Sequence, residues 1–299
     1  MTVDTFGIES ADAIIDLALA EDLGERGDVT SLAVIDPQEH SQVHVVAREE
    51  GRLSGAALIE RVYSALAHYQ SAEDLCRVEL SLADGAILKP GSLIATVSGP
   101  VRSLLSGERI ALNFLSHLSG IATRTAAFVE RTVGTDVAVL DTRKTLPGYR
   151  LLQKYAVRCG GGTNHRMGLY DGVLIKDNHL AAHADRSVAQ GVVAARRYLD
   201  AESLQLGIEV EVDTLYQLKD VLRQAPDIVL LDNMPPTELQ KAVKIRNAQS
   251  PSTLLEASGG INLDSIGCVA ASGVDRISIG GLTHSAVALD IGYDWPDRS

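Results

Sequence analysis

The chain has 299 residues, 45% of them hydrophobic, and a formal net charge of −12 at pH 7. A chain of this length buries a substantial core, enough for one large α/β barrel or two ordinary domains. A pI near 5.1 disfavours a broad surface for nucleic acid or anionic membranes, because such a surface needs lysine and arginine over a wide face.

The beginning of the chain and the cysteines favour a cytoplasmic protein. Segment 1–22 carries acids where a secretory signal would carry lysine or arginine, and no apolar run reaches the roughly 18 to 20 residues that a membrane span needs. Cys76, Cys159 and Cys268 lie far apart and form no CxxC motif. We therefore expect reduced thiols rather than disulfides, and no partnership with a membrane or nucleic acid.

The first third of the chain predicts a small mixed α/β domain. Apolar residues at helical spacing predict a helix over 10–20, and another is expected near 56–67. From about residue 104 to 131 the apolar period is again 3.6, which predicts one or two helices that link this domain to the next. Short alternating runs bounded by glycine, proline and aspartate predict strands at 43–47, 78–82 and 93–97.

From residue 136 onward, short apolar runs alternate with helical stretches, which is typical of a parallel sheet. Nearly every run ends in polar or glycine residues, and the strands of a (β/α) barrel converge with their carboxyl ends on one face. An open, doubly wound sheet would instead carry a glycine-rich turn after its first strand, and none is present. The pattern favours a barrel with strands at 137–140, 173–175, 208–212, 228–231, 253–257 and 277–279.

One segment of this acidic protein is strongly basic. Between Arg143 and Lys176 the chain carries seven lysine and arginine residues and His165 against the single acid Asp171. Guanidinium groups grip carboxylates through two parallel hydrogen bonds, and lysine adds a point charge, so we expect an anion pocket. The candidates at or just after strand ends are Arg143, Lys144, His165, Arg166 and Lys176. By contrast, the spacing by four residues of Arg150, Lys154 and Arg158 predicts a solvated helix face.

Glycines and acids at later strand ends point to phosphate and sugar. Gly259-Gly260 and Gly280-Gly281 follow the last two runs, where barrels commonly bind phosphate through backbone N–H groups, although tight turns alone would also explain them. Glu209 and Asp232 could accept sugar hydroxyls or hold Mg²⁺ through water. Their alternative role is to pair structurally with the nearby cations.

Segments across nearly the whole chain resemble the quinolinate phosphoribosyltransferases, the decarboxylating enzymes of NAD biosynthesis. The most specific of them read DTRKT, NHR and IKDNH, and others read EVEVD, LLDN and ASGGI. The resemblance implies an α/β sandwich domain with linking helices over 1–130 and an incomplete (β/α) barrel over 131–282. It also implies that a tail over 283–299 returns to the first domain.

The same resemblance implies roles for individual residues. It assigns catalysis to Lys144, Lys176, Glu209 and Asp232. It assigns quinolinate binding to Arg109, Arg143, Lys144, His165, Arg166 and Lys176. It assigns phosphoribosyl pyrophosphate (PRPP) to Lys144, Lys176, Glu209, Asp232, Ser258, Gly259, Gly260, Gly280 and Gly281. Mg²⁺ is expected near Glu209 and Asp232, and a homodimer is expected in which Arg109 enters the site of the partner subunit.

Three other functions stay open from the sequence. A nicotinate-type phosphoribosyltransferase would handle one carboxylate and release no CO₂, and the surplus of cations argues against it. A sensor of phosphorylated metabolites would bind without turnover. A sugar-phosphate isomerase or aldolase would use Lys176 or Lys144 to form a Schiff base.

Overall fold

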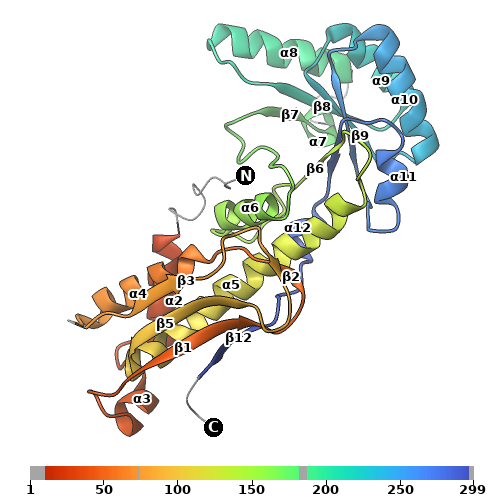
Figure 1. The fold of residues 1–299 in the computed structure, drawn as a ribbon. Coiled ribbons are helices and arrows are strands. Elements are labelled where there is room, and N and C mark those ends of the chain that lie inside the picture. Colours follow the sequence, from red (N-terminus) through yellow and green to blue (C-terminus); the bar gives the residue numbers. More distant parts are fainter. Residues whose placement is uncertain (1–10, 73, 182–186, 296–299) are drawn as a thin grey trace. The chain divides into compact units, whose positions relative to one another are not determined.

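The computed structural model describes residues 11–72, 74–181 and 187–295 (Figure 1). The chain divides into two compact units. The first contains the chain up to residue 126 together with 145–161 and the segment from 281 onward, and the second contains 127–144 and 162–280. None of the described helices combines the length and apolar character that crossing a bilayer would require. The expected start of the first helix, at residue 10, lies outside the described residues.

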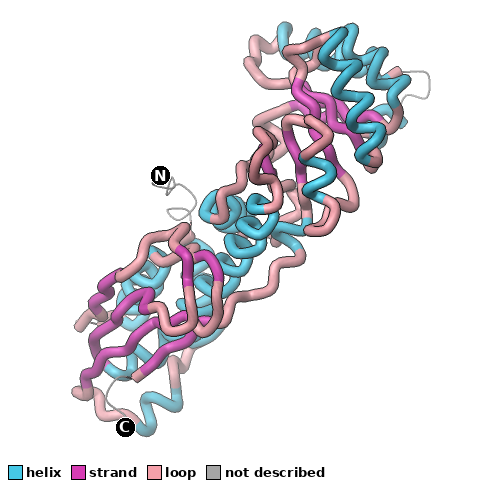
Figure 2. Tube along the Cα trace, turned by 45° about the vertical axis from the view of Figure 1, so that its right-hand side comes forward, coloured by secondary structure: helices cyan, strands magenta, loops and turns pink. Residues whose placement is uncertain are grey.

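The first unit is built on a four-stranded antiparallel sheet in the order β12-β1-β5-β3. Along β1 the side chains of Val43, Val45 and Ala47 are buried and alternate with more accessible ones, as expected for a sheet with one covered face. Helices lie along that sheet in both views (Figures 1 and 2). The strands are β1 (His40–Ala47), β3 (Arg77–Leu80), β5 (Leu93–Pro100) and β12 (Ile291–Asp294), and β2 (Gly51–Arg52) pairs separately with β4 (Ile87–Leu88).

Six helices of the described residues lie wholly or mostly in the first unit. The predicted helices at 10–20 and 56–67 correspond to α2 and α4, and the predicted linking helices form one continuous helix of 30 residues, α5. The segment predicted as a returning tail contains β12, which pairs with β1 in antiparallel register from His44↔Asp294 to Ala47↔Ile291. The helices are α2 (Asp12–Leu23), α3 (Val29–Val34), α4 (Ala57–Gln70), α5 (Val101–Glu130), α6 (Arg150–Cys159) and α12 (Gly281–His284).

The second unit contains a six-stranded parallel sheet in the order β6-β11-β10-β9-β8-β7. This is the order of strands around a barrel, with no ladder between β6 and β7 in the described part of the chain. On the side of β6 away from β11, Thr163 forms an isolated parallel bridge with Leu140, and its N–H donates to Val139 O at 2.8 Å. The prediction of an α/β protein with an incomplete barrel is confirmed. The strands are β6 (Ala138–Leu140), β7 (Val173–Ile175), β8 (Ile208–Val212), β9 (Ile228–Asp232), β10 (Leu254–Ser258) and β11 (Arg276–Ser278).

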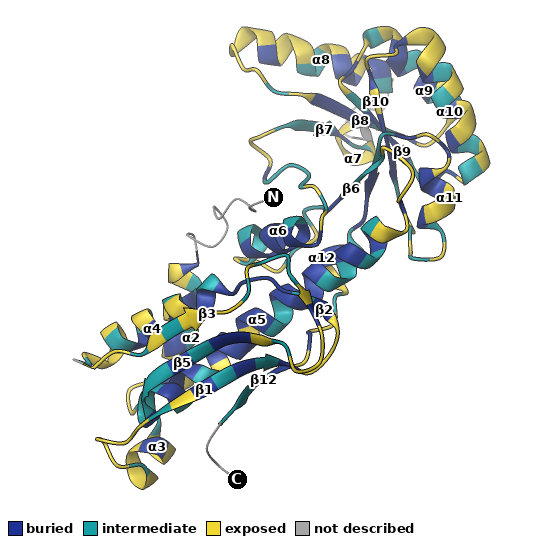
Figure 3. Ribbon diagram, viewed as in Figure 1, coloured by how far each residue is buried: buried dark blue, intermediate teal, exposed yellow. Residues whose placement is uncertain are grey.

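Helices between these strands cover the sheet and leave their outer faces exposed, whereas the central strands are buried (Figure 3). Two of the helices begin with a capping box, Ser187 with Gln190 in α8 and Thr214 with Gln217 in α9, which satisfies N–H groups that the first helical turn leaves unpaired. The helical elements are α7 (Asp177–Ala181), α8 (Val188–Ala201), α9 (Leu215–Val221), η1 (Leu222–Gln224), α10 (Pro236–Gln249) and α11 (Ile266–Ala270).

The segment 145–161, predicted as part of the barrel domain, groups with the first unit instead. In it, the hydroxyl of Tyr155 on α6 donates to Asp84 Oδ2 at 2.6 Å, and α6 contacts α12. The prediction that Arg150, Lys154 and Arg158 form a solvated face is wrong. Lys154 is fully buried and the two arginines are half-buried, because α6 packs among other elements of its unit.

Candidate active site at the carboxyl edge of the parallel sheet

Charged and polar residues gather at the carboxyl edge of the six-stranded sheet. The parallel register places Ser258, at the end of β10, beside Asp232 on β9 and beside Ser278 on β11. Lys176 follows β7 directly, and Asp141 follows β6. Because the six strands run in parallel, these ends share one edge, which is where the active sites of α/β barrels lie.

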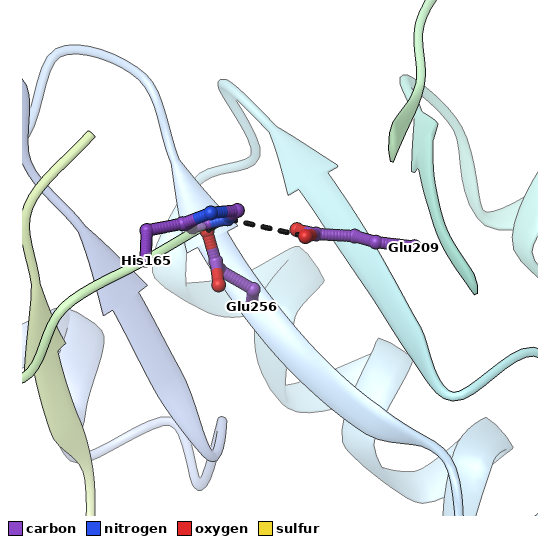
Figure 4. A group of neighbouring side chains, drawn as sticks. All are labelled: His165, Glu209 and Glu256. Carbon is purple, nitrogen blue, oxygen red and sulfur yellow. Dashed lines mark ion pairs between the residues drawn. The ribbon is translucent and has the colours of Figure 1, made fainter. Parts of the chain in front are cut away.

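A histidine held by two carboxylates lies beneath this edge (Figure 4). His165 Nε2 is 3.1 Å from Glu209 Oε2 and 3.4 Å from Glu256 Oε1. Glu256 Oε2 accepts a hydrogen bond of 2.7 Å from Arg276 Nε. The side chains of the histidine and both acids are less than a tenth exposed, and Glu256 is not exposed at all. The cluster therefore joins β8, β10 and β11 through charge-assisted contacts shielded from water.

The backbone around His165 is fixed by a third acid, Asp141, and the ring is fixed by the amide of the next residue. The two carboxylate oxygens of Asp141, which is fully buried, accept from His165 N at 2.9 Å and from Asn164 Nδ2 at 2.6 Å. His165 Nδ1 lies 2.7 Å from the Arg166 amide, which donates to it. In the neutral ring the hydrogen therefore lies on Nε2, where it faces the carboxylates.

The two acids also favour the cationic ring. Burial lowers the pKa of His165, but the hydrogen bonds and charges of Glu209 and Glu256 outweigh it and raise the pKa to about 9. A second proton would occupy Nδ1 and end the bond from the Arg166 amide, which opposes part of this increase. Burial would raise the pKa of Glu256, but His165 and Arg276 hold it below its usual range.

Two guanidinium groups next to this cluster form the positive part of the site. Burial, and then the positive charge of Arg143, lower the pKa of Arg166. Arg166 also donates to Gly172 O at 3.0 Å, which fixes its direction. Arg143 is half-buried, and its buried Nε has no hydrogen-bond partner among the described residues. Two guanidiniums that repel each other, one with an unused donor, are suited to hold a carboxylate anion.

Lys176, which follows β7, is paired with an acid on the adjacent strand. Its ammonium forms an ion pair with Glu211 Oε2 on β8, which the parallel register places in the adjacent strand. The Lys176 side chain is 40% exposed and that of Glu211 is 10% exposed. The pair therefore holds the ammonium at the rim of the sheet edge while leaving part of it accessible to a ligand.

The glycines after β10 form a close turn next to Asp232. Asn233 has a φ of 51°, donates its amide N–H to Ser258 O at 2.9 Å, and donates its side-chain Nδ2 to Asp232 Oδ2 at 2.6 Å. Gly259 has a φ of 97°, and a Cβ there would lie 2.1 Å from Asn233 Oδ1. Gly260 has a φ of 61°, and apart from its chain neighbours no heavy atom of the described residues lies within 4 Å of the position of its Cβ. Only glycine fits the first position, and the second leaves its backbone open to a ligand.

The predicted site residues fall into both compact units. Arg109 lies exposed on α5 and Gly281 opens α12, both in the first unit. Gly280 and Lys144 end segments of the second unit, to which all the other predicted site residues belong. Of the second-unit residues, Lys176, Asp232 and Ser258 lie at or directly after strand ends. The prediction that Glu209 lies at a strand end is wrong, because it is the second residue of β8, beside Ile228 at the start of β9, and contacts His165 from there. The substrate roles of every predicted residue stay predictions.

Several residues of the cluster were not predicted from the sequence. Each interrupts a short apolar strand or lies at its end, and a charge in a buried strand implies an ionic partner. That signal was present, but it does not reveal which partner each charge has. The residues are Asp141, Glu211, Asn233, Glu256 and Arg276.

The acids of the cluster suit a hard cation. Glu209 Oε1 is buried and has no hydrogen-bond partner in the described part of the chain, and carboxylate oxygens are the ligands that Mg²⁺ prefers. The ligand atoms of His165, Glu209 and Glu256 lie within 4.8 Å of one another. Arg276 already pairs with Glu256, so Glu209, which has an unused Oε1, is the acid of the two with capacity for a metal-bound water.

Comparisons with known proteins agree on one family. The domain models for the N-terminal and the C-terminal domain of quinolinate phosphoribosyl transferase match residues 28–119 and 121–294. The chain is 44% identical to the nicotinate-nucleotide pyrophosphorylase [carboxylating] of Mycobacterium leprae, over 93% of this chain and 94% of that protein. It is 38% identical to quinolinate phosphoribosyltransferase [decarboxylating] 1b of Nicotiana tabacum, over 93% and 80%.

A solved structure shows the same fold. NadC from Streptococcus pyogenes superposes with a TM-score of 0.87 at 36% identity, covering 98% of both chains. With two domain models that together match most of the sequence, the chain belongs to the quinolinate phosphoribosyl transferase family.

Proposed function

We propose that the protein transfers the phosphoribosyl group of PRPP to the ring nitrogen of quinolinate and releases pyrophosphate, CO₂ and nicotinate mononucleotide, a step of NAD biosynthesis. The observation that carries this proposal is the pair of guanidiniums, Arg143 and Arg166, next to the carboxylate-held His165. A dicarboxylate relieves their mutual repulsion and accepts their hydrogen bonds. The names of the relatives describe the same reaction, in one or the other direction.

In the first step, the lone pair of the quinolinate nitrogen forms a bond to the anomeric carbon of the ribose, and pyrophosphate leaves with the electrons of the carbon–oxygen bond. Positive charge develops on the sugar as this bond breaks. Glu209 and Asp232 would stabilise that charge, while the N–H groups of the turn at Gly259-Gly260 would hold phosphate oxygens. Lys176 and Lys144 would bind the departing anion.

In the second step, the carbon–carbon bond to the 2-carboxylate breaks and CO₂ departs. The electron pair stays on the ring carbon beside the positively charged nitrogen, and a proton then completes the product. Arg143, Arg166 and His165 would hold the carboxylates so that the ring keeps its orientation through both steps. A site with this many cations favours a dicarboxylate over nicotinate, the substrate of the nearest alternative.

Glu209 and Asp232 are the residues that would hold Mg²⁺ through water, and the ion would then offset the negative charge of the pyrophosphate. We expect activity to fall when a chelator removes divalent cations and to return when Mg²⁺ is added. Activity that persists in excess chelator would remove the metal from the proposal without touching the assignment of the two substrates.

The direct test mixes purified protein with quinolinate, PRPP and Mg²⁺ and measures CO₂ and pyrophosphate. Equal release of both supports the proposal, and turnover of nicotinate instead of quinolinate overturns it. A sensor would show binding without turnover. The pairing of Lys176 with Glu211 argues against Lys176 as a Schiff-base lysine, because a paired ammonium lacks the lone pair that attacks a carbonyl. Borohydride trapping with a keto substrate would detect such an intermediate.

The proposal includes a homodimer in which Arg109 enters the site of the partner subunit. Arg109 is exposed on α5 and so is accessible for such a role. We expect Arg109→Ala and Lys176→Ala each to be nearly inactive and mixed dimers of the two to regain part of the activity, because one site of each mixed dimer keeps both residues. No recovery in demonstrably mixed dimers would refute the sharing. A cytoplasmic location is also expected, and cell fractionation would test it.

A further inference from the structure

Glu256 is a buried carboxylate that has no role in either step of the proposed reaction. It lies in the middle of β10, an otherwise apolar strand, and its side chain is completely inaccessible to solvent. An ionised carboxylate at such a position is costly unless it is paired. Its charged partners are Arg276 Nε at 2.7 Å and His165 Nε2 at 3.4 Å, and the Ser278 side chain also hydrogen-bonds to it.

One side of Glu256 is anchored rigidly. The register of the parallel sheet places Glu256 directly beside Arg276 on β11, so their ion pair bridges two hydrogen-bonded strands. The ion pair uses Oε2, and the other oxygen, Oε1, is the one that lies 3.4 Å from His165 Nε2. Oε1 is buried and makes no aligned hydrogen bond among the described residues. Glu256 Oε1 can therefore accept a hydrogen bond from His165.

Glu209 approaches the same nitrogen from β8, two strands away from β10 in the sheet. Its contact with His165 Nε2 is shorter, 3.1 Å against 3.4 Å, but no arginine anchors it in the described structure. Glu209 is also the acid that is expected to face the ribose and the metal-bound water. When it turns to the sugar, the hydrogen on His165 Nε2 loses its nearer acceptor, and Glu256 Oε1, 3.4 Å from that nitrogen, is in place to accept it.

We propose that Glu256, anchored by Arg276, is a positioning residue that keeps the His165 ring in its substrate-binding orientation when Glu209 engages the sugar. This inference rests on the proposed function of the site, because it assigns the His165 ring to quinolinate and Glu209 to PRPP. It gives the two acids different tasks. Glu209 exchanges partners during the reaction, whereas Glu256 stays with His165 throughout.

The first test reads His165 directly and needs no turnover. In protein labelled with ¹⁵N-histidine, the Nε2–H signal is assigned by its loss in His165→Asn. Glu209→Leu imitates the state in which Glu209 has turned away, and we expect the signal to persist there, because Glu256 accepts the hydrogen. Addition of Glu256→Gln to that variant removes the charged acceptor, and exchange of the hydrogen with water is expected to be at least about tenfold faster. A signal already lost in Glu209→Leu overturns the proposal.

The second test is kinetic. Glu256→Gln keeps the size of the side chain. We expect it to raise the KM for quinolinate by roughly tenfold, because about one charge-assisted hydrogen bond is lost. The KM for PRPP should change by less than about twofold. Asp294→Asn is the control, because it weakens an ion pair of the first unit, that with Arg48 at 2.5 Å, and touches neither acid of the cluster. Equal effects on both KM values, or the same effect in the control, overturn the proposal.

The two tests separate this inference from the function on which it rests. If the wild-type protein does not convert quinolinate and PRPP, the proposed function fails, while the His165 signal still reports whether Glu256 holds the ring. If the wild-type protein is active but the signal disappears in Glu209→Leu, the function stands and the positioning role of Glu256 is wrong.

Discussion

Substitution of the two neighbouring glycines after β10 separates packing from ligand binding. Gly259 and Gly260 both have a positive φ, 97° and 61°, so an alanine at either position strains the backbone by about 1–2 kcal/mol. At Gly259 the new Cβ would also lie 2.1 Å from Asn233 Oδ1 and 3.0 Å from Asn233 N. Displacing that residue adds roughly 1–3 kcal/mol, the usual cost of overpacking.

We therefore expect Gly259→Ala to lower the free energy of unfolding by about 1–3 kcal/mol more than Gly260→Ala does. Urea unfolding of the two variants beside the wild type measures the difference. The reason lies in Asn233, which holds Asp232 Oδ2 through its side chain at 2.6 Å, so the clash at Gly259 also disturbs an acid of the site. Equal losses of stability would show that the turn relaxes without cost and would refute the packing argument.

The same two variants test the phosphate role. Apart from its chain neighbours, no heavy atom of the described residues lies within 4 Å of the position of a Cβ at Gly260, so Gly260→Ala is expected to fold with little loss beyond its backbone strain. Its methyl group would nevertheless enter the space through which a phosphate reaches the backbone N–H groups. The KM for PRPP should rise by at least about tenfold, equivalent to about 1.4 kcal/mol, with the KM for quinolinate nearly unchanged. An unchanged KM for PRPP would remove Gly260 from the phosphate site.

Three further predictions concern stability. Gly120→Ala places a Cβ 2.0 Å from Val287 O, a backbone atom, so we expect it to prevent soluble expression or to lower the melting temperature strongly. Arg246 is 7% exposed and pairs with Asp275, and Arg246→Met should lower the free energy of unfolding in urea by about 2–3 kcal/mol. Asp275 keeps its hydrogen bond from Leu255 N but loses its cationic partner, and Thr253 O loses the donor that Arg246 supplies. Asp28 caps α3. Burial raises the pKa of its carboxyl group, but hydrogen bonds, mainly from Ser31, lower this pKa overall. The contribution of Asp28 to folding stability is therefore present above the unfolded pKa of about 3.8 and is lost as the pH falls through the lower folded value. The stability difference between wild type and Asp28→Ala should accordingly shrink as the pH falls below about 4.

The sequence by itself determined the elements of the second unit and the chemistry of its edge. The runs predicted at 173–175 and 208–212 coincide with β7 and β8, because a short run rich in β-branched apolar residues is a local property of a strand. The basic segment likewise identified Arg143 and Arg166 as cations at strand ends. Only charge and position along the chain were needed for this.

The tertiary structure decided which charges meet. Glu256 reads in the sequence as one acid in an apolar run, and its pairing with His165 and Arg276 depends on the register of β10 against β11 and on where the chain after β6 returns to the sheet. The burial of Lys154 depended in the same way on what packs over α6. Side-chain periodicity tells which face of one element a residue occupies, but contacts between distant segments form only when the sheet and its loops close, and no local pattern encodes that closure.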